Sequence, residues 1–299
     1  MRPAFARHGI RLFDVTMRDG LQSVKHFIPL EKKKEMVIDL LAQHNFDSIE
    51  IGSLVSKKAM PQMSTSIELF EFTKDYIWDS GYLNPRIFML VPPKFERFAQ
   101  AHELGVRHVS IMSSVSDAFQ KKNVRQNTAQ THSTINNALK TLHFSSAKVY
   151  LSCVDECPVS KEKMQVERII DCVKDYVFMS EVTEVCLSDT MGTLKWWKFL
   201  AILERLSGCN IPMKKISMHL HLPNNKDYDN ISRIVYAALQ SGITNIDVSD
   251  IETGGCNMTL EDNQLHGNMT YDVLEKVIEK NEKIPDYDLK VNPFLISKN

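Results

Sequence analysis

Two histidines, His219 and His221, stand two positions apart in the apolar run KISMHLH (215–221). If this run is a β-strand, both imidazoles point to the same face, because side chains alternate along a strand. A single histidine in such a run is more often a core residue than a ligand, but a pair at this spacing favours a metal site. Asp19 can add a carboxylate oxygen to the pair, and Asn268 can add an amide oxygen.

These four residues would form an open metal centre. Two imidazoles and two oxygens leave coordination positions for water or substrate, as catalytic sites do and closed structural zinc sites do not. The mixed ligands fit Mg²⁺ or Mn²⁺, although an imidazole pair also suits Zn²⁺, Co²⁺ or Fe²⁺. The sequence does not choose among these ions.

Charged residues at other predicted strand ends are candidates for catalysis. Arg18 precedes Asp19, so it either forms a structural ion pair or stabilises a developing enolate oxygen beside the metal. Glu50 and Asp189 are either tied into salt bridges at the rim of the core, or they position Arg18 or accept protons. His219 is a further candidate for the base.

Cys256 follows two glycines in GGCNMTLEDNQLHGNMTYD (254–272), outside any strand or helix pattern. Of the six cysteines it is therefore expected to be the most accessible thiol. Cys153, Cys172 and Cys186 lie in periodic apolar segments, where reduced core thiols are expected.

Short β-rich runs alternate with longer amphipathic segments along the whole chain. This alternation predicts a parallel sheet, and eight such units fit a closed (β/α)8 TIM barrel, one α/β domain over residues 1–299. An open doubly wound sheet is the competing fold, but no Gly-rich phosphate-binding fingerprint follows the first run. In a barrel, chemistry takes place at the C-terminal ends of the strands. The eight predicted strands are residues 11–16, 48–53, 87–92, 108–114, 148–153, 183–189, 215–221 and 245–250.

The composition excludes several classes of partner. A formal net charge of −1 gives no polyelectrolyte character, so no nucleic acid partner is expected. No apolar run approaches the roughly 20 residues of a membrane span, so no membrane partner is expected. The basic stretch at the N-terminus is short before the first strand-like run, and a cytoplasmic protein without a cleaved leader is expected.

Several segments resemble 3-hydroxy-3-methylglutaryl-CoA lyases, members of a metal-dependent barrel group that includes isopropylmalate and homocitrate synthases. FDVTMRDGLQSVK (13–25) resembles the first-strand signature in its lyase form, because Leu21 stands where the synthases usually have Glu. The other similar segments are IEIGSLVSKKAMPQM (49–63), SDAFQKKN (116–123), LSCVDECP (151–158) and SDTMG (188–192).

The resemblance implies roles for the matching residues. Asp19, His219, His221 and Asn268 would hold the cation, and Arg18 would stabilise the enolate. Cys256 would be a mobile acid/base on a loop that closes over an acyl-CoA substrate. Contacts to the substrate would come from Gln22, Lys25, Ser53 and Asn123.

The sequence departs from the family in four respects. One is the stretch from Cys256 to Asn268, which is a few residues longer than the family's. Leu222-Pro223 follow the second histidine in place of Asp-Thr, and Asn257-Met258-Thr259 replace the usual Pro-Tyr-Ala after the loop cysteine. Asp272 stands where a glutamate near the metal is expected.

The expected reaction is retro-Claisen cleavage of 3-hydroxy-3-methylglutaryl-CoA, or a close 3-hydroxyacyl-CoA, to acetyl-CoA and acetoacetate. A Claisen-type synthase and a non-catalytic barrel that binds acyl-CoA are the alternatives. The complete ligand set speaks against the second of these. A homodimer is compatible with the resemblance, but the sequence does not determine the oligomeric state.

Overall fold

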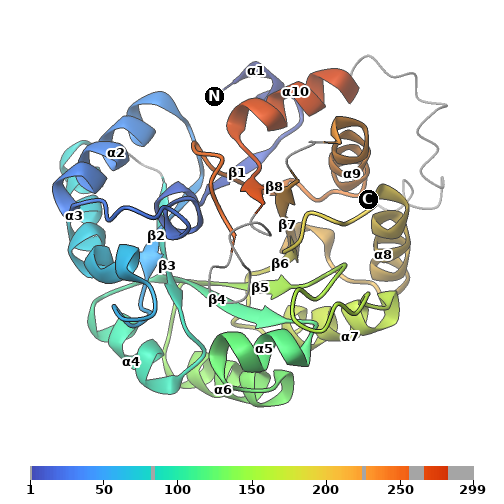
Figure 1. Cartoon of the computed structure of the whole chain (residues 1–299), viewed down its shortest axis with the longest axis horizontal. Coiled ribbons are helices and arrows are strands. Elements are labelled where there is room, and N and C mark those ends of the chain that lie inside the picture. Colours follow the sequence, from blue (N-terminus) through green and yellow to red (C-terminus); the bar gives the residue numbers. More distant parts are fainter. Residues whose placement is uncertain (1, 82–84, 224–226, 256–265, 282–299) are drawn as a thin grey trace.

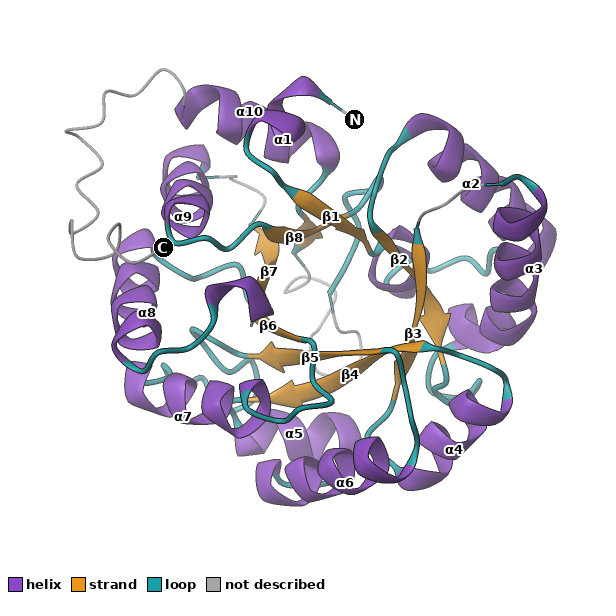
Figure 2. Ribbon diagram, turned by 180° about the vertical axis from the view of Figure 1, so that it is seen from behind, coloured by secondary structure: helices purple, strands orange, loops and turns teal. Residues whose placement is uncertain are grey.

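Eight parallel strands close into a barrel in the computed structural model, which describes residues 2–81, 85–223, 227–255 and 266–281. Strand β1 pairs with both β2 and β8, and β6 pairs with β7, so the sheet has no open edge among these strands. Helices surround the ring of strands (Figures 1 and 2). The strands are β1 (Arg11–Asp14), β2 (Ser48–Ser53), β3 (Arg86–Val91), β4 (His108–Ser114), β5 (Ser146–Ser152), β6 (Glu184–Asp189), β7 (Ile216–Leu222) and β8 (Asn245–Val248).

The outer layer is built from amphipathic helices. In α7, Ile169, Val173 and Val177 are buried, whereas Asp171 and Asp175 are exposed, as a helix with one core-facing side requires. The helices are α1 (Pro3–Arg7), α2 (Leu30–Gln43), α3 (Ser66–Asp79), α4 (Phe95–Glu103), α5 (Asp117–Val124), α6 (Thr128–Thr141), α7 (Val166–Val177), α8 (Trp196–Gly208), α9 (Tyr228–Gln240) and α10 (Tyr271–Asn281).

The strands are buried on both faces, and their side chains alternate between two cores. In β5, Val149 and Leu151 belong to the large core shared with the helices, whereas Tyr150 packs in a small cluster with Leu90 and Cys186. Because alternate residues of a barrel strand point inward, Tyr150 and its neighbour Lys148 both lie on the barrel side of the sheet.

The predicted barrel is confirmed, and the predicted strands match the observed ones to within two residues at each end. Helix α7 begins at Val166, whereas the apolar period suggests a start near residue 160. Residue Lys161 has a positive φ of 58°, and Glu156 forms a β-bridge with Lys163, so this segment forms a turn before the helix. The short helices α1 and α5 were not predicted.

One additional strand bears on the site. The two-residue β9 (Gly267–Asn268) pairs antiparallel with the end of β7, which places Asn268 opposite His221. The segment after β8 thus pairs with the strand that carries both histidines. In the described part of the chain, no helix is both long and apolar enough to cross a membrane.

Candidate active site and metal centre

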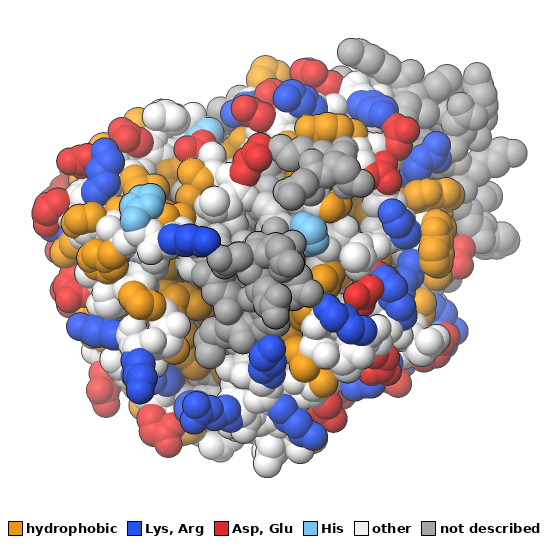
Figure 3. All heavy atoms as spheres, viewed as in Figure 1, with side chains coloured by type: hydrophobic (Ala, Val, Ile, Leu, Met, Phe, Trp, Pro, Cys, Tyr) orange, Lys and Arg blue, Asp and Glu red, His pale blue; other side chains and the backbone are white. Residues whose placement is uncertain are grey.

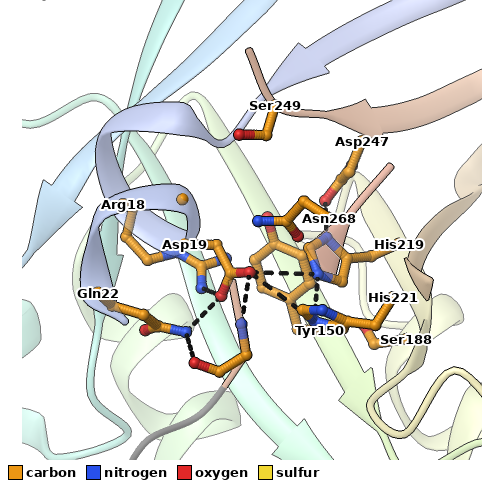
Figure 4. Close-up of polar contacts among 12 residues, drawn as sticks. Arg18, Asp19, Gln22, Tyr150, Ser188, His219, His221, Asp247, Ser249 and Asn268 are labelled. Atoms are coloured by element: carbon orange, nitrogen blue, oxygen red, sulfur yellow. Dashed lines mark hydrogen bonds and ion pairs between the residues drawn. The ribbon is translucent and has the colours of Figure 1, made fainter. Parts of the chain in front are cut away.

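A cavity of about 320 Å³ opens at the C-terminal ends of the strands. Six predicted residues line it: Arg18, Asp19, Gln22, Asn123, His219 and His221. The barrel therefore brings residues from opposite ends of the sequence to one place, as Figure 4 shows.

A tight turn after β1 presents Arg18 and Asp19 to this cavity. Residues Thr16–Gly20 form one π-helical turn, a feature often found at functional sites. The carboxylate of Asp14 anchors its start by accepting hydrogen bonds from the Thr16 backbone N–H and hydroxyl, at 3.0 and 2.9 Å. The hydroxyl of Tyr271 donates to the same carboxylate at 2.8 Å, which ties the turn to α10.

The two histidines face each other and Asp19. Their Nε2 atoms lie 3.0 Å apart, and Asp19 Oδ2 lies 3.8 Å from His219 Nε2 and 3.7 Å from His221 Nε2 (Figure 4). The three residues are buried and form a group whose ligand atoms lie within 4.8 Å of one another. This spacing suits three donors around a single cation.

The hydrogen bonds behind the histidines determine which ring nitrogen faces the cavity. His219 Nδ1 lies 3.2 Å from Asp247 Oδ2, and His221 Nδ1 lies 3.0 Å from the backbone carbonyl of His266. Both partners are acceptors, so each Nδ1 carries the hydrogen and each Nε2 presents a lone pair. Two lone pairs facing at 3.0 Å repel unless a cation lies between them. Burial, followed by the charge of His219, lowers the pKa of His221 to about 4, so its imidazole is neutral near pH 7.

Asn268 contributes a buried oxygen that has no partner in the part of the chain that the structure describes. Its Nδ2 donates to the carbonyl of Thr253 at 3.0 Å, which directs the amide. Its Oδ1 has no hydrogen-bond partner within the described ranges, although a buried acceptor without one is costly. Because β9 places Asn268 beside His221, this oxygen fits the fourth position of the predicted ligand set.

The guanidinium of Arg18 is fixed between two carboxylates. Its Nε donates to Glu50, and its Nη1 donates to Asp19 Oδ1 at 2.5 Å. Although burial would lower the pKa of Arg18, Glu50 and Asp19 raise it above its ordinary value. Glu50 is itself fully buried and accepts from Ser110, so its contacts are those of a residue that positions Arg18.

Gln22 connects Asp19 to the glycine-rich segment. Its Nε2 donates to Asp19 Oδ1 at 2.5 Å and to the carbonyl of Gly255 at 2.8 Å. Burial would raise the pKa of Asp19, but Arg18 and the two histidines hold it below its usual range. The carboxylate is therefore ionised, as a metal ligand must be.

Three predicted residues lie away from the main cavity. Lys25 lines a smaller neighbouring cavity with Gln22 and Pro61. Ser53 is buried and donates its backbone N–H to Ser66 Oγ at 3.0 Å. Asp189 accepts hydrogen bonds from the backbone N–H groups of residues 193 and 194, at 3.2 and 2.9 Å, which shapes the loop after β6. Burial raises the pKa of Asp189 to about 6.

Two further predictions concern residues near the site. Cys256 lies outside the described residues, so its predicted role stays a prediction. Asp272, expected near the metal, forms an ion pair with Arg2 at 2.7 Å, and its side chain is 73% exposed. It therefore links α10 to the N-terminal segment and does not support the site.

Sequence reasoning missed Asp247, Tyr150 and Gly254. Asp247 orients His219, and the ring of Tyr150 lies 5.3 Å from the Arg18 guanidinium carbon. A signal was available for Asp247, because a charged residue inside an apolar strand needs a buried partner. The role of Gly254 could not be read from the sequence, because only the tertiary packing shows that Asn268 and Asp19 lie against it.

The fold and this cluster define a barrel protein with three buried residues that could hold a metal ion, and sequence comparison assigns the family. The HMGL-like family model matches residues 9–279, so the chain belongs to the HMGL-like family.

Individual relatives agree with this assignment. The chain is 28% identical over 250 residues to a 3-hydroxy-3-isohexenylglutaryl-CoA/hydroxy-methylglutaryl-CoA lyase of Pseudomonas aeruginosa, covering 83% of this chain and 78% of the relative. It is 26% identical over 249 residues to the mitochondrial hydroxymethylglutaryl-CoA lyase of Bos taurus, covering 83% and 72%. A crystal structure of hydroxymethylglutaryl-CoA lyase from Pseudomonas aeruginosa superposes with a TM-score of 0.76 at 25% identity, covering 97% of this chain and 94% of the other.

Proposed function

We propose that the protein is a divalent-metal-dependent carbon–carbon lyase that cleaves 3-hydroxy-3-methylglutaryl-CoA, or a close 3-hydroxyacyl-CoA, to acetyl-CoA and acetoacetate. The observation that carries this proposal is the convergence of two Nε2 lone pairs on the Asp19 carboxylate beside Arg18. Asn268, opposite His221, adds an oxygen that has no partner among the described residues. The lyases among its relatives support the choice of reaction.

The cation would be held by Asp19, His219, His221 and Asn268. Mg²⁺ or Mn²⁺ fits the oxygen donors, and Zn²⁺ or Co²⁺ would also accept the imidazoles. A divalent ion at this place supplies Lewis acidity, which lowers the pKa of a substrate hydroxyl bound to it.

The protein's own groups then carry the proton and the charge. The carboxylate of Asp19 takes the proton of the substrate's tertiary hydroxyl. His219, the other predicted base, could take it only while its Nε2 lone pair is not on the cation. As the C2–C3 bond breaks, its electron pair passes to the thioester carbonyl, leaving the ketone of acetoacetate and the enolate of acetyl-CoA. Arg18 hydrogen-bonds the enolate oxygen. Within the described ranges its Nη2 makes no hydrogen bond and is left for this purpose.

The enolate carbon requires a proton, which we assign to the thiol of Cys256. An unperturbed thiol has a pKa of about 8.5, so it is a usable acid near neutral pH. The proton taken from the hydroxyl later restores the thiol, which balances the reaction. Glu50 holds Arg18 in place, and Gln22 contacts the substrate carboxylate. Asn123, Lys25 and Ser53 stay proposed substrate contacts, and Asp189 stays a proposed catalytic group.

The mouth of the cavity suits a coenzyme A thioester. Lys94, Arg97 and Arg125 line it together with apolar residues such as Leu54 and Met60. The phosphates of coenzyme A would pair with the basic side chains, and its pantetheine arm would pass along the apolar wall. Figure 3 shows Lys and Arg side chains interspersed with Asp and Glu on one face of the molecule.

One assay tests the proposal. Acetoacetate would be measured after incubation with 3-hydroxy-3-methylglutaryl-CoA, using protein dialysed against EDTA and then supplied with Mg²⁺ or Mn²⁺. We expect no product without metal and recovery with it. Undiminished activity after chelation would reject the metal mechanism.

Two further incubations separate the alternatives. Condensation of acetyl-CoA with 2-oxo acids would instead identify a synthase. Binding of the acyl-CoA without any turnover would identify a non-catalytic barrel. Cytoplasmic location and homodimer formation are further predictions, to be checked by cell fractionation and by light scattering.

A further inference from the structure

A line of charged groups, buried except for the partly exposed Glu184, leads to His219. Lys148, on β5, lies 3.0 Å from Glu184 Oε1 and 2.5 Å from Asp247 Oδ1. Asp247, on β8, uses its other oxygen to face His219 Nδ1 at 3.2 Å. The order is therefore Glu184, Lys148, Asp247 and His219, over four different strands.

Lys148 is held on every side that the structure describes. Its side chain is 1% exposed, and its Nζ lies 3.6 Å from the centre of the Phe13 ring and 5.0 Å from that of Tyr150. Aromatic faces attract a cation, the Asp247 carboxylate accepts a hydrogen bond from Lys148, and Glu184 adds an ion pair. A lysine confined in this way has one geometry, so it can fix the geometry of its partners.

The two oxygens of Asp247 have separate tasks. Lys148 occupies Oδ1, so the carboxylate plane is set and Oδ2 points at His219. An acceptor at Nδ1 keeps the hydrogen there and leaves the lone pair on Nε2, toward Asp19 and His221. His221 obtains the same orientation differently, from the backbone carbonyl of His266. Only one of the two histidines depends on the buried charges.

We propose that Lys148 is a positioning residue for the metal site, acting through Asp247 on His219. The inference rests on the proposed metal-dependent function. Without Lys148, the Asp247 carboxylate loses its charge partner and the bond that fixes its plane, and His219 loses a defined tautomer. Groups that orient a metal-bound histidine typically change metal affinity 10–100-fold when they are replaced. We expect a loss of this size in Lys148→Met.

The test measures Mn²⁺ affinity directly. The full-length protein is first stripped of metal with a chelator and then titrated with Mn²⁺, and the concentration of free Mn²⁺ is measured by electron paramagnetic resonance. Lys148→Met should bind Mn²⁺ 10–100-fold more weakly, and Lys148→Arg should recover most of the affinity. Lys215→Met is the control, because Lys215 bonds only to backbone carbonyls of residues 177 and 182 in the described structure. Its Mn²⁺ affinity should equal that of the wild type.

A double-mutant cycle identifies the route of the effect. If Lys148 acts through His219, Lys148→Met should cost no further affinity in a His219→Gln background, but its full cost should persist in a His221→Gln background. Equal costs in both backgrounds would overturn the inference.

Stability is measured separately, as the melting temperature in EDTA. A Lys148→Met variant with a lowered melting temperature but wild-type Mn²⁺ affinity would show a purely structural lysine. If Lys148→Met does not fold, the same two quantities, Mn²⁺ affinity and melting temperature, are compared between the wild type and Lys148→Gln, which keeps a neutral donor for Asp247. A wild-type protein that binds none of Mn²⁺, Mg²⁺, Zn²⁺ and Co²⁺ would instead overturn the proposed metal function itself, so the two failures are distinguishable.

Discussion

Gly254 lies against Asn268 so closely that a Cβ atom at position 254 would stand 2.4 Å from Asn268 Nδ2 and 3.0 Å from Asp19 Oδ2. The missing side chain thus sets how closely two proposed metal-binding groups approach. A methyl group there must displace at least one of them, because real Cβ contacts under 3.0 Å essentially never occur.

We therefore expect Gly254→Ala to lower Mn²⁺ affinity at least about tenfold, with little change in the melting temperature of the metal-free protein. Gly208→Ala, near the end of α8, is the matched control, since no atom lies within 4 Å of its added Cβ. That variant should bind metal normally. Equal metal affinity in both variants would show that the glycine is not needed for the site.

Arg18→Gln should fold and lose turnover by about 10³-fold or more. Removing one preorganised donor typically costs about 10²–10³ in rate, and here a full charge is removed with it. Turnover and melting temperature should be measured on the same sample. Arg18→Lys keeps the charge but loses the fork that joins Glu50 and Asp19, so its turnover should lie between that of the wild type and that of Arg18→Gln. If Arg18 were only a structural ion pair, activity per folded molecule would be kept while the melting temperature fell.

His108 should make stability depend on pH. Burial, followed by Arg86 and Arg107, lowers its pKa from 6.5 to about 4. The unfolded chain therefore binds more protons than the folded one between these values, so this contribution to stability is complete above about pH 6.5 and is lost as the pH falls toward 4. The melting temperature should decline less between pH 7 and 5 in His108→Gln than in the wild type. Parallel curves would contradict the assignment.

Cys256 should be the first thiol modified by stoichiometric alkylation, and bound substrate should slow the labelling. Cys153, Cys157 and Cys186 are buried, which protects them from the reagent. Cys256→Ser should lose most turnover with little change in substrate affinity, because a hydroxyl is far too weak an acid to replace the thiol. Near-normal turnover in this variant would remove the acid/base role and leave the metal site standing.

The barrel could be predicted because its signal is local and repeated. Each strand is a short apolar run and each helix a longer amphipathic one, so eight alternations determine the architecture. The exceptions are short segments. Helix α1 has five residues, and it packs through Ala4 and Phe5 while Arg2, just before it, pairs with Asp272 and Glu275 of α10.

The histidine pair could also be predicted, because strand spacing alone places His219 and His221 on one face. The hydrogen-bond partner toward which a single carboxylate points could not be predicted in this way. Glu50 and Asp189 are both acidic residues near strand ends, yet Glu50 holds Arg18 whereas Asp189 accepts from its own loop. The different partners of Glu50 and Asp189 depend on the conformation of the residues that follow each strand.

The sequence by itself determined the eight strands, the face shared by the two histidines and the strand-end position of Arg18 and Asp19, because each follows from spacing along the chain. Only the tertiary structure decided that Asn268 stands opposite His221, that Gly254 leaves room for it, and that Lys148 reaches His219 through Asp247. These contacts join residues up to 99 positions apart. They depend on the register between strands and on the closure of the barrel, which bring side chains together regardless of their separation in the chain.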